Sequence, residues 1–69
     1  MDLGDFLLQY KTKNNLSYRK FAMLIGINEN SLLRIINKKV KPSGKTCMKV
    51  SRLTGISFSE VIDMRESNT

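Results

Sequence analysis

The chain has 69 residues, of which 41% are hydrophobic and 26% are charged, and its net charge is +6. A chain of this length forms one small domain, and its composition is that of a globular protein rather than a disordered one. It contains no His, a single Cys and no apolar run long enough to span a bilayer, which excludes His-based catalysis, a zinc site of several cysteines and a transmembrane helix.

The first part of the chain has the periodicity of an amphipathic helix. Its apolar residues stand at i, i+3, i+4 and i+7, which are Leu3, Phe6, Leu7 and Tyr10. Asp2 can cap the start of this helix or oppose its dipole, and Asn14 and Asn15 are expected to end it. The sequence therefore predicts a first helix that buries one face.

Two short helices joined by a three-residue turn are predicted next. Ser17 is the expected N-cap of the first, whose core residues would be Phe21, Ala22, Leu24 and Ile25. Gly26 ends it, because glycine adopts the left-handed conformation of a helix terminus without steric cost. Ile27 is expected to point inward from the turn. Asn28 would cap the second helix of the pair, with core residues Leu32, Ile35 and Ile36.

A basic connection separates these helices from a fourth one. It runs over residues 37–42, where Pro42 prevents the preceding helix from continuing. Ser43 is the expected cap of the fourth helix and Gly55 its end. The apolar face of this helix would include Cys47, Val50 and Leu53, and we expect Cys47 and the methionines to belong to the core.

A fifth helix begins at a capping box, in which the Ser57 hydroxyl and the Glu60 carboxylate each bind a free backbone N–H. Its buried face would consist of Val61, Ile62 and Met64. With five short helices and no strand candidate, the fold class is all-α. We expect a single domain over residues 1–69, with a helix-turn-helix at about 17–37 and a frayed tail at about 65–69.

Basic and acidic residues are unevenly distributed along the chain. Eleven basic residues lie from Lys11 to Arg52, where Glu29 is the only acidic residue, and the other acids lie near the two ends, at Asp2, Asp5, Glu60, Asp63 and Glu66. This polarity favours a polyanion such as DNA as the partner, although a basic surface kept for solubility would look the same. No GxxxxGK or GxGxxG motif for binding phosphates occurs. Together with the absence of His and of a second Cys, this leads us to expect no enzyme, no cofactor or metal and no small-molecule ligand.

The segment from Leu16 to Ile35 resembles the helix-turn-helix of the phage-repressor/Cro (XRE-like) family. That family has a small residue in the first helix, here Ala22, and glycine in the turn, here Gly26. Its apolar positions correspond to Phe21, Ile25, Ile27, Leu32 and Ile35. Pro42-Ser43 and the later junction Leu53-Thr54-Gly55-Ile56-Ser57 match as well. The resemblance covers about residues 3–63 and implies a compact five-helix lambda-repressor-like domain.

The chain departs from the family pattern at two places. Lys20 stands where Glu is usual, so the common capping box of the second helix is lost. Lys11 and Ile36 stand where family members often carry an Arg–Glu ion pair. We interpret the second change as the replacement of a partly buried ion pair by apolar packing, which need not reduce stability. This interpretation requires Ile36 to be buried.

The resemblance implies that the third helix reads bases in the major groove, and its expected base-reading residues are Glu29, Asn30, Leu33 and Arg34. Arg34 would bind a guanine, Asn30 an adenine and Leu33 a thymine methyl group. Glu29 would either accept from a cytosine or only favour the positive end of the helix.

Phosphate contacts are expected on both sides of that helix. The residues expected to make them are Ser17, Tyr18, Arg19, Asn28, Asn37, Lys38, Lys39 and Lys41. For Asn28 a capping role is the stronger expectation, and for any single Lys a free surface charge is an equal alternative. Lys45, Lys49 and Arg52 are expected to be free surface charges, because their helix lies further from the groove.

These assignments predict a transcription regulator that binds double-stranded DNA sequence-specifically, of the phage or mobile-element repressor type. The alternative is a protein-interaction module with the same fold, such as an antitoxin or anchoring domain. The residues Phe58, Ile62 and Met64 would form the surface of a weak or DNA-assembled homodimer, or would only close the monomer core. We expect a cytoplasmic, nucleoid-associated location and no membrane contact.

Overall fold

Five helices follow one another in the order that the sequence predicts. The structure, a computed structural model, describes residues 1–68. The helices are α1 (Leu3–Lys13), α2 (Tyr18–Ile25), α3 (Glu29–Ile36), α4 (Gly44–Thr54) and α5 (Phe58–Glu66). The described residues contain no strand, so the all-α fold class is confirmed. No helix of this part of the chain is both long and apolar enough to cross a membrane.

Every helix begins at the residue that the sequence predicts as its N-cap. The side chains of these residues accept a hydrogen bond from the N–H three positions on; they are Asp2, Ser17, Asn28, Ser43 and Ser57. Gly26 and Gly55 end α2 and α4 with φ of 95° and 78°, a region that glycine enters without strain. The capping box of α5 is half formed, since the described hydrogen bonds include that of Ser57 but not the reverse one from Glu60.

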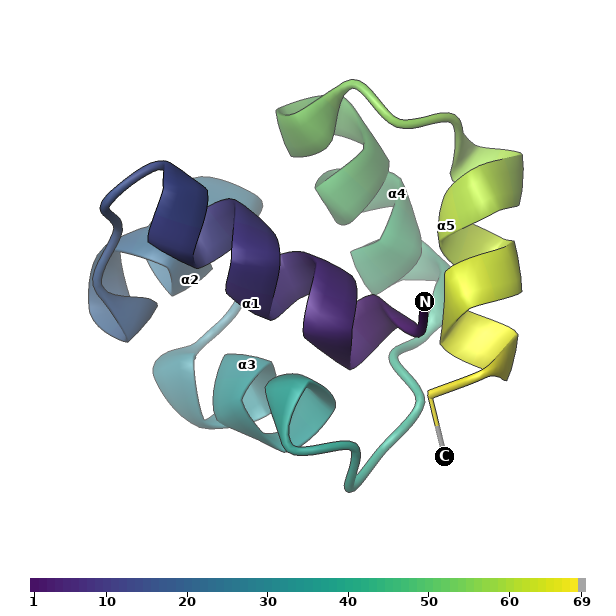
Figure 1. Ribbon diagram of the computed structural model, residues 1–69, viewed down its shortest axis with the longest axis horizontal. Coiled ribbons are helices and arrows are strands. Elements are labelled where there is room, and N and C mark those ends of the chain that lie inside the picture. The colour runs from purple at the N-terminus through teal and green to yellow at the C-terminus, as the bar shows by residue number, and fades with distance from the viewer. Residues whose placement is uncertain (69) are drawn as a thin grey trace.

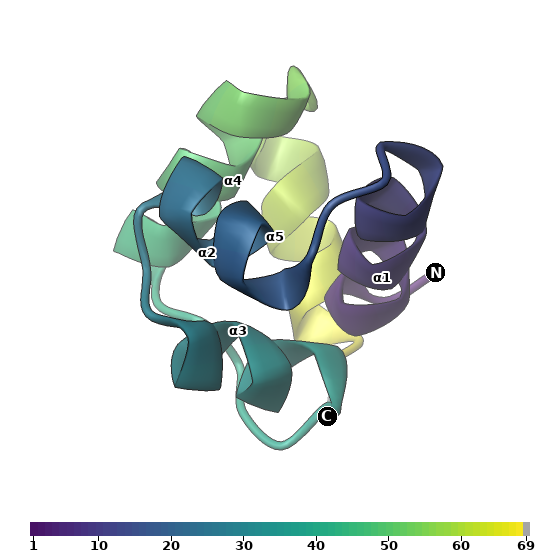
Figure 2. The ribbon, with the colours of Figure 1, turned by 90° about the vertical axis from the view of Figure 1, so that its left-hand side faces the viewer.

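The helices pack around one small core. α1 contacts α3 and α5, α2 contacts α3 and α4, and α4 contacts α5. Figure 1 shows α1 in front of the molecule, with α3 below it and α5 at one side. In Figure 2, α2 and α3 face the viewer and α5 lies behind them. The helix-turn-helix and α5 therefore occupy opposite sides of the domain.

The core contains the predicted apolar faces of the helices. Its buried residues are Leu3, Leu7, Phe21, Ala22, Ile25, Leu32, Ile35, Ile36, Cys47, Val50 and Val61. Phe6, Tyr10, Ile27 and Leu53 pack against it from the edge. Ile36 is only 8% exposed, which supports the replacement of the ion pair by packing. Lys11 instead lies over the ring of Tyr18, 4.4 Å from its centroid.

Two predictions about the core are wrong. Leu24 is 46% exposed, because Phe21, Ala22 and Ile25 already define the inward face of α2 and Leu24 lies outside it. Three of the four methionines are exposed as well, at Met1, Met23 and Met48. Met64 alone packs against the core, from a partly buried position.

The C-terminal segment also differs from the expectation. We expected it to fray from about residue 65, but α5 continues to Glu66. Asn68 is 1% exposed and its side chain is hydrogen-bonded to three other segments. An isolated polar residue near a chain end gives no sequence signal of burial, since the partners that satisfy it are backbone groups distant in sequence. The remainder of the expected tail, residue 69, lies outside the described residues.

Candidate nucleic-acid interface

The exposed face of α3 presents the side chains expected to read bases. Asn30, Leu33, Arg34 and Asn37 recur at i, i+3, i+4 and i+7, so they share one side of the helix. The opposite side consists of Leu32, Ile35 and Ile36, all buried. Asn30 and Arg34 are exposed and Leu33 is half-buried; Glu29 is also exposed, in the first turn. Burial of one side of α3 thus turns the predicted base-reading residues to solvent.

The start of α2, a helix that packs against α3, carries further residues expected to contact phosphates. The Ser17 hydroxyl accepts from the Lys20 N–H at 3.0 Å, so its first role is to cap the helix. Tyr18 is half-buried, with its ring against the core and under the Lys11 ammonium. Arg19, by comparison, is exposed. Of the three residues expected to bind phosphate here, only Arg19 is charged, and it forms no ion pair with another described residue.

The connection between α3 and α4 places its lysines in different environments. Asn37 is the C-cap of α3, and Lys38 follows with φ of 62°. The Lys38 ammonium lies 3.0 Å from a carboxylate oxygen of Asp2 and 3.1 Å from one of Asp5. The hydrogen bond to Asp2 raises the pKa of Lys38. The pKa of Asp2 is lowered by the hydrogen bond that its carboxylate accepts from the Asp5 N–H and, to a lesser extent, by the contact with Lys38.

These contacts give Lys38 a role in the fold, and a phosphate would have to compete with Asp2 and Asp5 for its ammonium group. Lys41 lies 3.6 Å from a carboxylate oxygen of Glu66, a loose surface pair that a phosphate can replace. Lys39 is exposed and has no ion pair among residues 1–68. Lys39 is therefore the cation that the connection presents most freely.

One lysine of α4 supports the turn of the helix-turn-helix, which the sequence did not indicate. The Lys49 ammonium donates to the Gly26 carbonyl at 3.0 Å, and α4 packs on α2 at this place. The prediction of a free surface charge is wrong for Lys49. Its contact joins residues 23 positions apart, and no local motif marks such a pair.

A shallow cleft lies beside Arg34, with a volume of about 220 Å³. It is bordered by the connection at Val40 and Pro42 and by the first turn of α4. Its polar lining comes from Ser31, Arg34, Ser43 and Thr46. The start of α4 thus brings the Ser43 and Thr46 side chains beside Arg34, and hydroxyl groups at a helix start suit phosphate oxygens.

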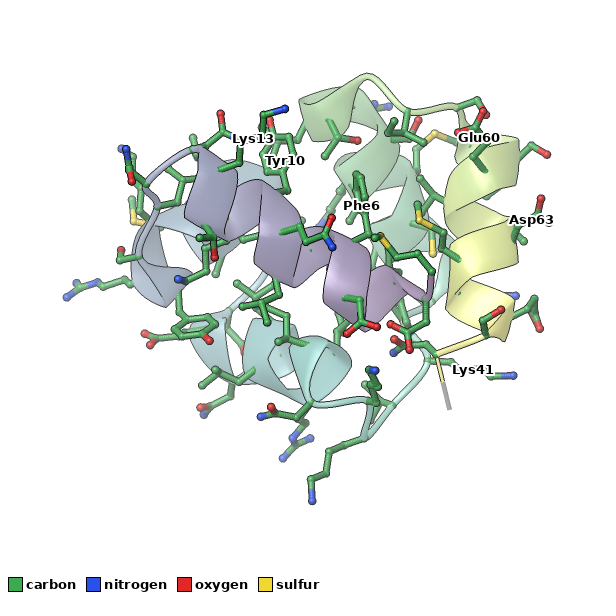
Figure 3. All side chains as sticks on the ribbon, in the orientation of Figure 1. Phe6, Tyr10, Lys13, Lys41, Glu60 and Asp63 are labelled. Atoms are coloured by element: carbon green, nitrogen blue, oxygen red, sulfur yellow. The ribbon has the colours of Figure 1, made fainter. Side chains whose placement is uncertain are left out.

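Apart from Glu29, the acidic side chains lie outside α2 and α3. Figure 3 shows Glu60 and Asp63 on α5, pointing away from the helix bundle, with Lys41 below that helix. Asp2 and Asp5 are occupied by Lys38. The described residues hold no group of three His, Cys, Asp or Glu side chains able to ligate a metal ion. The α2–α3 pair thus carries a single acidic residue, Glu29, whereas α5 carries three, and this uneven distribution favours a polyanion at the α2–α3 side.

The comparisons with known proteins agree with this arrangement. A family model described as helix-turn-helix, HTH_3, matches residues 7–61, which include the helix-turn-helix and most of the flanking helices. Neither the curated proteins nor the solved structures contain a significant match to the chain. Because the family model covers well over half of the chain, the chain belongs to the HTH_3 family of Cro/C1-type, XRE-like helix-turn-helix domains, which bind DNA and are not catalytic.

Proposed function

We propose that this protein is a sequence-specific transcription regulator, of the phage or mobile-element repressor type, that inserts α3 into the major groove of an operator. The observation that carries the proposal is the division of α3 into a buried side and an exposed side with Asn30, Leu33 and Arg34. A helix presented in this way fits the width of the major groove. It would act where DNA is accessible, at the nucleoid in the cytoplasm.

The residues of α3 have separate roles in this proposal. Arg34 carries five donors in a planar fork and would bind O6 and N7 of a guanine. Asn30 would pair with an adenine, and Leu33 would contact a thymine methyl group. Glu29 would accept from a cytosine, or would act only on the helix dipole.

Backbone contacts would flank the helix on both sides. Before it, Arg19 would supply a charge, with the Ser17 hydroxyl, Tyr18 and the Asn28 region supplying weaker contacts. After it, Asn37, Lys39 and Lys41 would reach the opposite phosphates. Lys38 would contribute less to this set, because its ammonium already lies against Asp2 and Asp5. Such contacts fix the register of the protein and supply affinity but no sequence preference.

The test is selection from a randomised duplex library at roughly physiological salt, about 0.15 M. Enrichment of one motif, above all as paired half-sites about 34–36 Å apart, would support an operator-binding regulator. Retention without enrichment would contradict sequence-specific reading. No retention at physiological or low salt would contradict DNA binding by the chain alone and would favour the protein-interaction alternative.

A further inference from the structure

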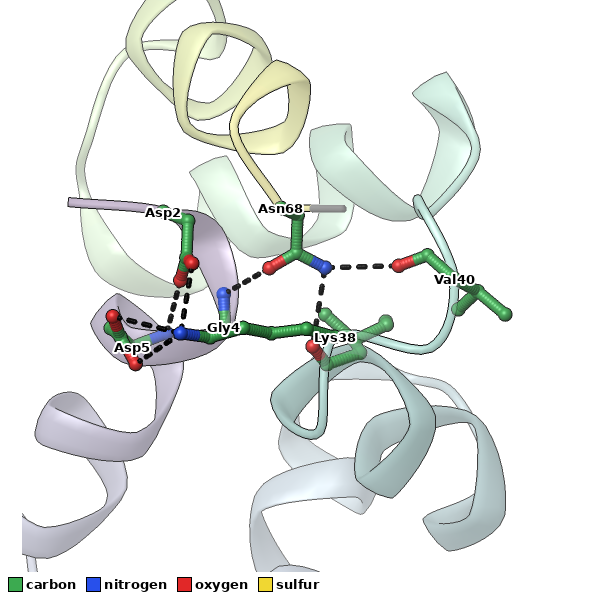
Figure 4. A network of polar contacts seen from close by, with 7 residues as sticks. Asp2, Gly4, Asp5, Lys38, Val40 and Asn68 are labelled. Carbon is green, nitrogen blue, oxygen red and sulfur yellow. Dashed lines mark hydrogen bonds and ion pairs between the residues drawn. The ribbon is translucent and has the colours of Figure 1, made fainter.

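A buried asparagine near the C-terminus joins three segments that surround the proposed interface. The Asn68 side-chain oxygen accepts from the Gly4 N–H at 2.7 Å. Its amide nitrogen donates to the Ile35 carbonyl at 3.2 Å and to the Val40 carbonyl at 2.9 Å. Figure 4 shows this amide between the start of α1, the end of α3 and the connection. Asn68 is the only buried polar residue of the described chain.

The backbone groups that Asn68 binds have few other partners. The Gly4 N–H lies in the first turn of α1, where no helix carbonyl is available to it. The Ile35 carbonyl lies in the last turn of α3, and the Lys38 N–H also donates to it, at 3.1 Å. Val40 belongs to the connection, outside any helix. Asn68 thus provides the Gly4 N–H with its partner, adds a second hydrogen bond to the Ile35 carbonyl and ties the Val40 carbonyl to both, which fixes their relative positions.

A second link joins the same segments independently. The Lys38 ammonium binds Asp2 and Asp5 in the first turn of α1, at 3.0 and 3.1 Å. Residues 38 and 39 are also bonded to the last turn of α3, since the Lys38 N–H donates to the Ile35 carbonyl and the Lys39 N–H donates to the Arg34 carbonyl at 2.9 Å. The two links add to these bonds and act on either side of Lys39. Their combined effect is to hold the connection against α1, with Lys39 between the two anchors and facing solvent.

We propose that Asn68 is a positioning residue of the DNA interface. It fixes the last turn of α3 and the connection, so that Lys39 and Lys41 meet phosphates on the far side of the groove while α3 reads bases. The inference rests on the proposed function and adds to it a residue that touches no DNA. Loss of the Asn68 amide leaves the helices in place but releases the connection, and the phosphate contacts after α3 weaken.

The experiment compares Asn68→Ala with two controls. Ser67→Ala changes the exposed neighbour, and Val61→Ala removes buried volume from α5 without touching the connection. Thermal unfolding, DNA affinity as a function of salt, and amide hydrogen exchange of residues 38–41 are measured for each protein. Affinity is measured at a temperature where all variants are folded. A loss of stability in Asn68→Ala or Val61→Ala then does not affect the measured affinity.

The expected result is specific to Asn68→Ala. Its DNA affinity falls by about fivefold, the equivalent of one weakened contact, and its salt slope decreases by about one charge. Amide exchange at residues 38–41 becomes faster, whereas Val61→Ala and Ser67→Ala keep the wild-type affinity, slope and local exchange.

Two outcomes would overturn the inference, and they are distinguishable from each other. If wild type binds DNA and Asn68→Ala, once folded, binds with unchanged affinity and slope, Asn68 has only a structural role. If wild type binds no DNA at any salt concentration, the proposed function fails and the positioning role fails with it.

Discussion

At the scale of single residues, the exposed side chains of α3 and of the connection should differ in what they contribute. Arg34→Ala should reduce affinity for the selected site by about 1–3 kcal/mol and relax the preference at one base pair. Lys39→Ala should weaken binding to all sequences alike and lower the salt slope by about one charge. Both effects are measured by titration of the selected duplex and of a scrambled duplex at several salt concentrations.

Arg52→Ala is the matched control for these variants, since it removes a positive charge from the end of α4. It should change neither the base preference nor the salt slope. An equal loss for Arg34→Ala on the selected and the scrambled duplex would show that Arg34 contacts phosphate only. An unchanged slope for Lys39→Ala would remove Lys39 from the interface.

Substitution by alanine should have opposite effects on stability at two glycines that lie at helix starts. A Cβ on Gly4 would lie 2.8 Å from the Ile35 carbonyl oxygen and 2.9 Å from that of Ile36, both backbone atoms that cannot turn aside. Gly4→Ala should therefore destabilise the fold by about 1–3 kcal/mol, as over-packing does elsewhere. Gly44 has open space around it, and Gly44→Ala should stabilise by about 0.5–1 kcal/mol through backbone entropy.

Urea unfolding at constant temperature measures both glycine variants. The comparison tests how closely α1 and the end of α3 approach, because the two substitutions add the same methyl group to a helical first turn. If Gly4→Ala unfolds at the same urea concentration as wild type, the close approach of α1 to α3 is incorrect. The position of α3 would then have to be reconsidered.

At the scale of helices and turns, Lys49 supports the geometry that joins α2 to α3. Lys49→Met keeps the hydrocarbon stem but loses the hydrogen bond to the Gly26 carbonyl. The expected cost is about 1 kcal/mol, as for a typical hydrogen bond at a partly exposed site. Lys45→Met removes the same charge from an exposed position of the same helix and should leave thermal stability nearly unchanged. Equal unfolding midpoints for the two variants would contradict a supporting role for Lys49.

The ion pairs between α1 and the connection should make stability dependent on pH. The folded protein holds the pKa of Asp2 below its ordinary value of 3.8 and that of Lys38 above its ordinary value of 10.5. The contribution of the ionised Asp2 to the free energy of unfolding is therefore complete above pH 3.8 and is lost as the pH falls through the lowered pKa. The contribution of the charged Lys38 to the free energy of unfolding is complete below pH 10.5 and is lost as the pH rises through the raised pKa.

Thermal unfolding of wild type and Asp2→Asn between pH 2 and 7 tests this dependence. Asp2→Asn should be less stable than wild type at neutral pH, and the two curves should converge in acid, where Asp2 is protonated in both states. An amide can still cap α1, so the difference reports the charge more than the cap. Parallel curves throughout this range would contradict a depressed pKa of Asp2.

Local signals in the sequence predict most of the elements. Capping residues and the terminal glycines mark the five helix starts and two of the ends, because their hydrogen bonds and backbone angles involve neighbours in the chain. The buried faces of α1 and α3 follow from helical periodicity. Leu24 fails that test because a continuous five-residue apolar run, residues 21–25, does not reveal which member lies at the edge of the face.

Contacts between distant residues could not be predicted in this way. Lys38 belongs to a run of basic residues that resembles a phosphate-binding loop, and only the fold brings it to Asp2 and Asp5. Lys49 and Asn68 bind backbone carbonyls, which carry no side-chain signature. The candidate site was thus predictable where it depends on one helix face, and unpredictable where it depends on how the connection is anchored.

At the scale of the whole molecule, α5 offers only a small apolar surface to a second copy. Phe58 is 38% exposed, whereas Ile62 and Met64, the other residues expected at a dimer surface, pack partly against the core. A stable interface buries about 1,200–2,000 Å² in total, far more than one exposed ring supplies. We therefore expect the free protein to be monomeric and pairing to occur on DNA, where adjacent half-sites raise the effective concentration of the second copy.

Phe58→Ser tests this form of pairing, with Met23→Ser on α2 as a control that removes an exposed apolar side chain from another surface. Phe58→Ser should bind an isolated half-site as wild type does, since α3 is unchanged, but should lose cooperativity on paired half-sites. Met23→Ser should keep both properties. Sedimentation of the free proteins and titration of one-site and two-site duplexes measure these effects. Wild-type cooperativity in Phe58→Ser would place the contact between copies outside α5, or show that the bound copies communicate through the DNA between them.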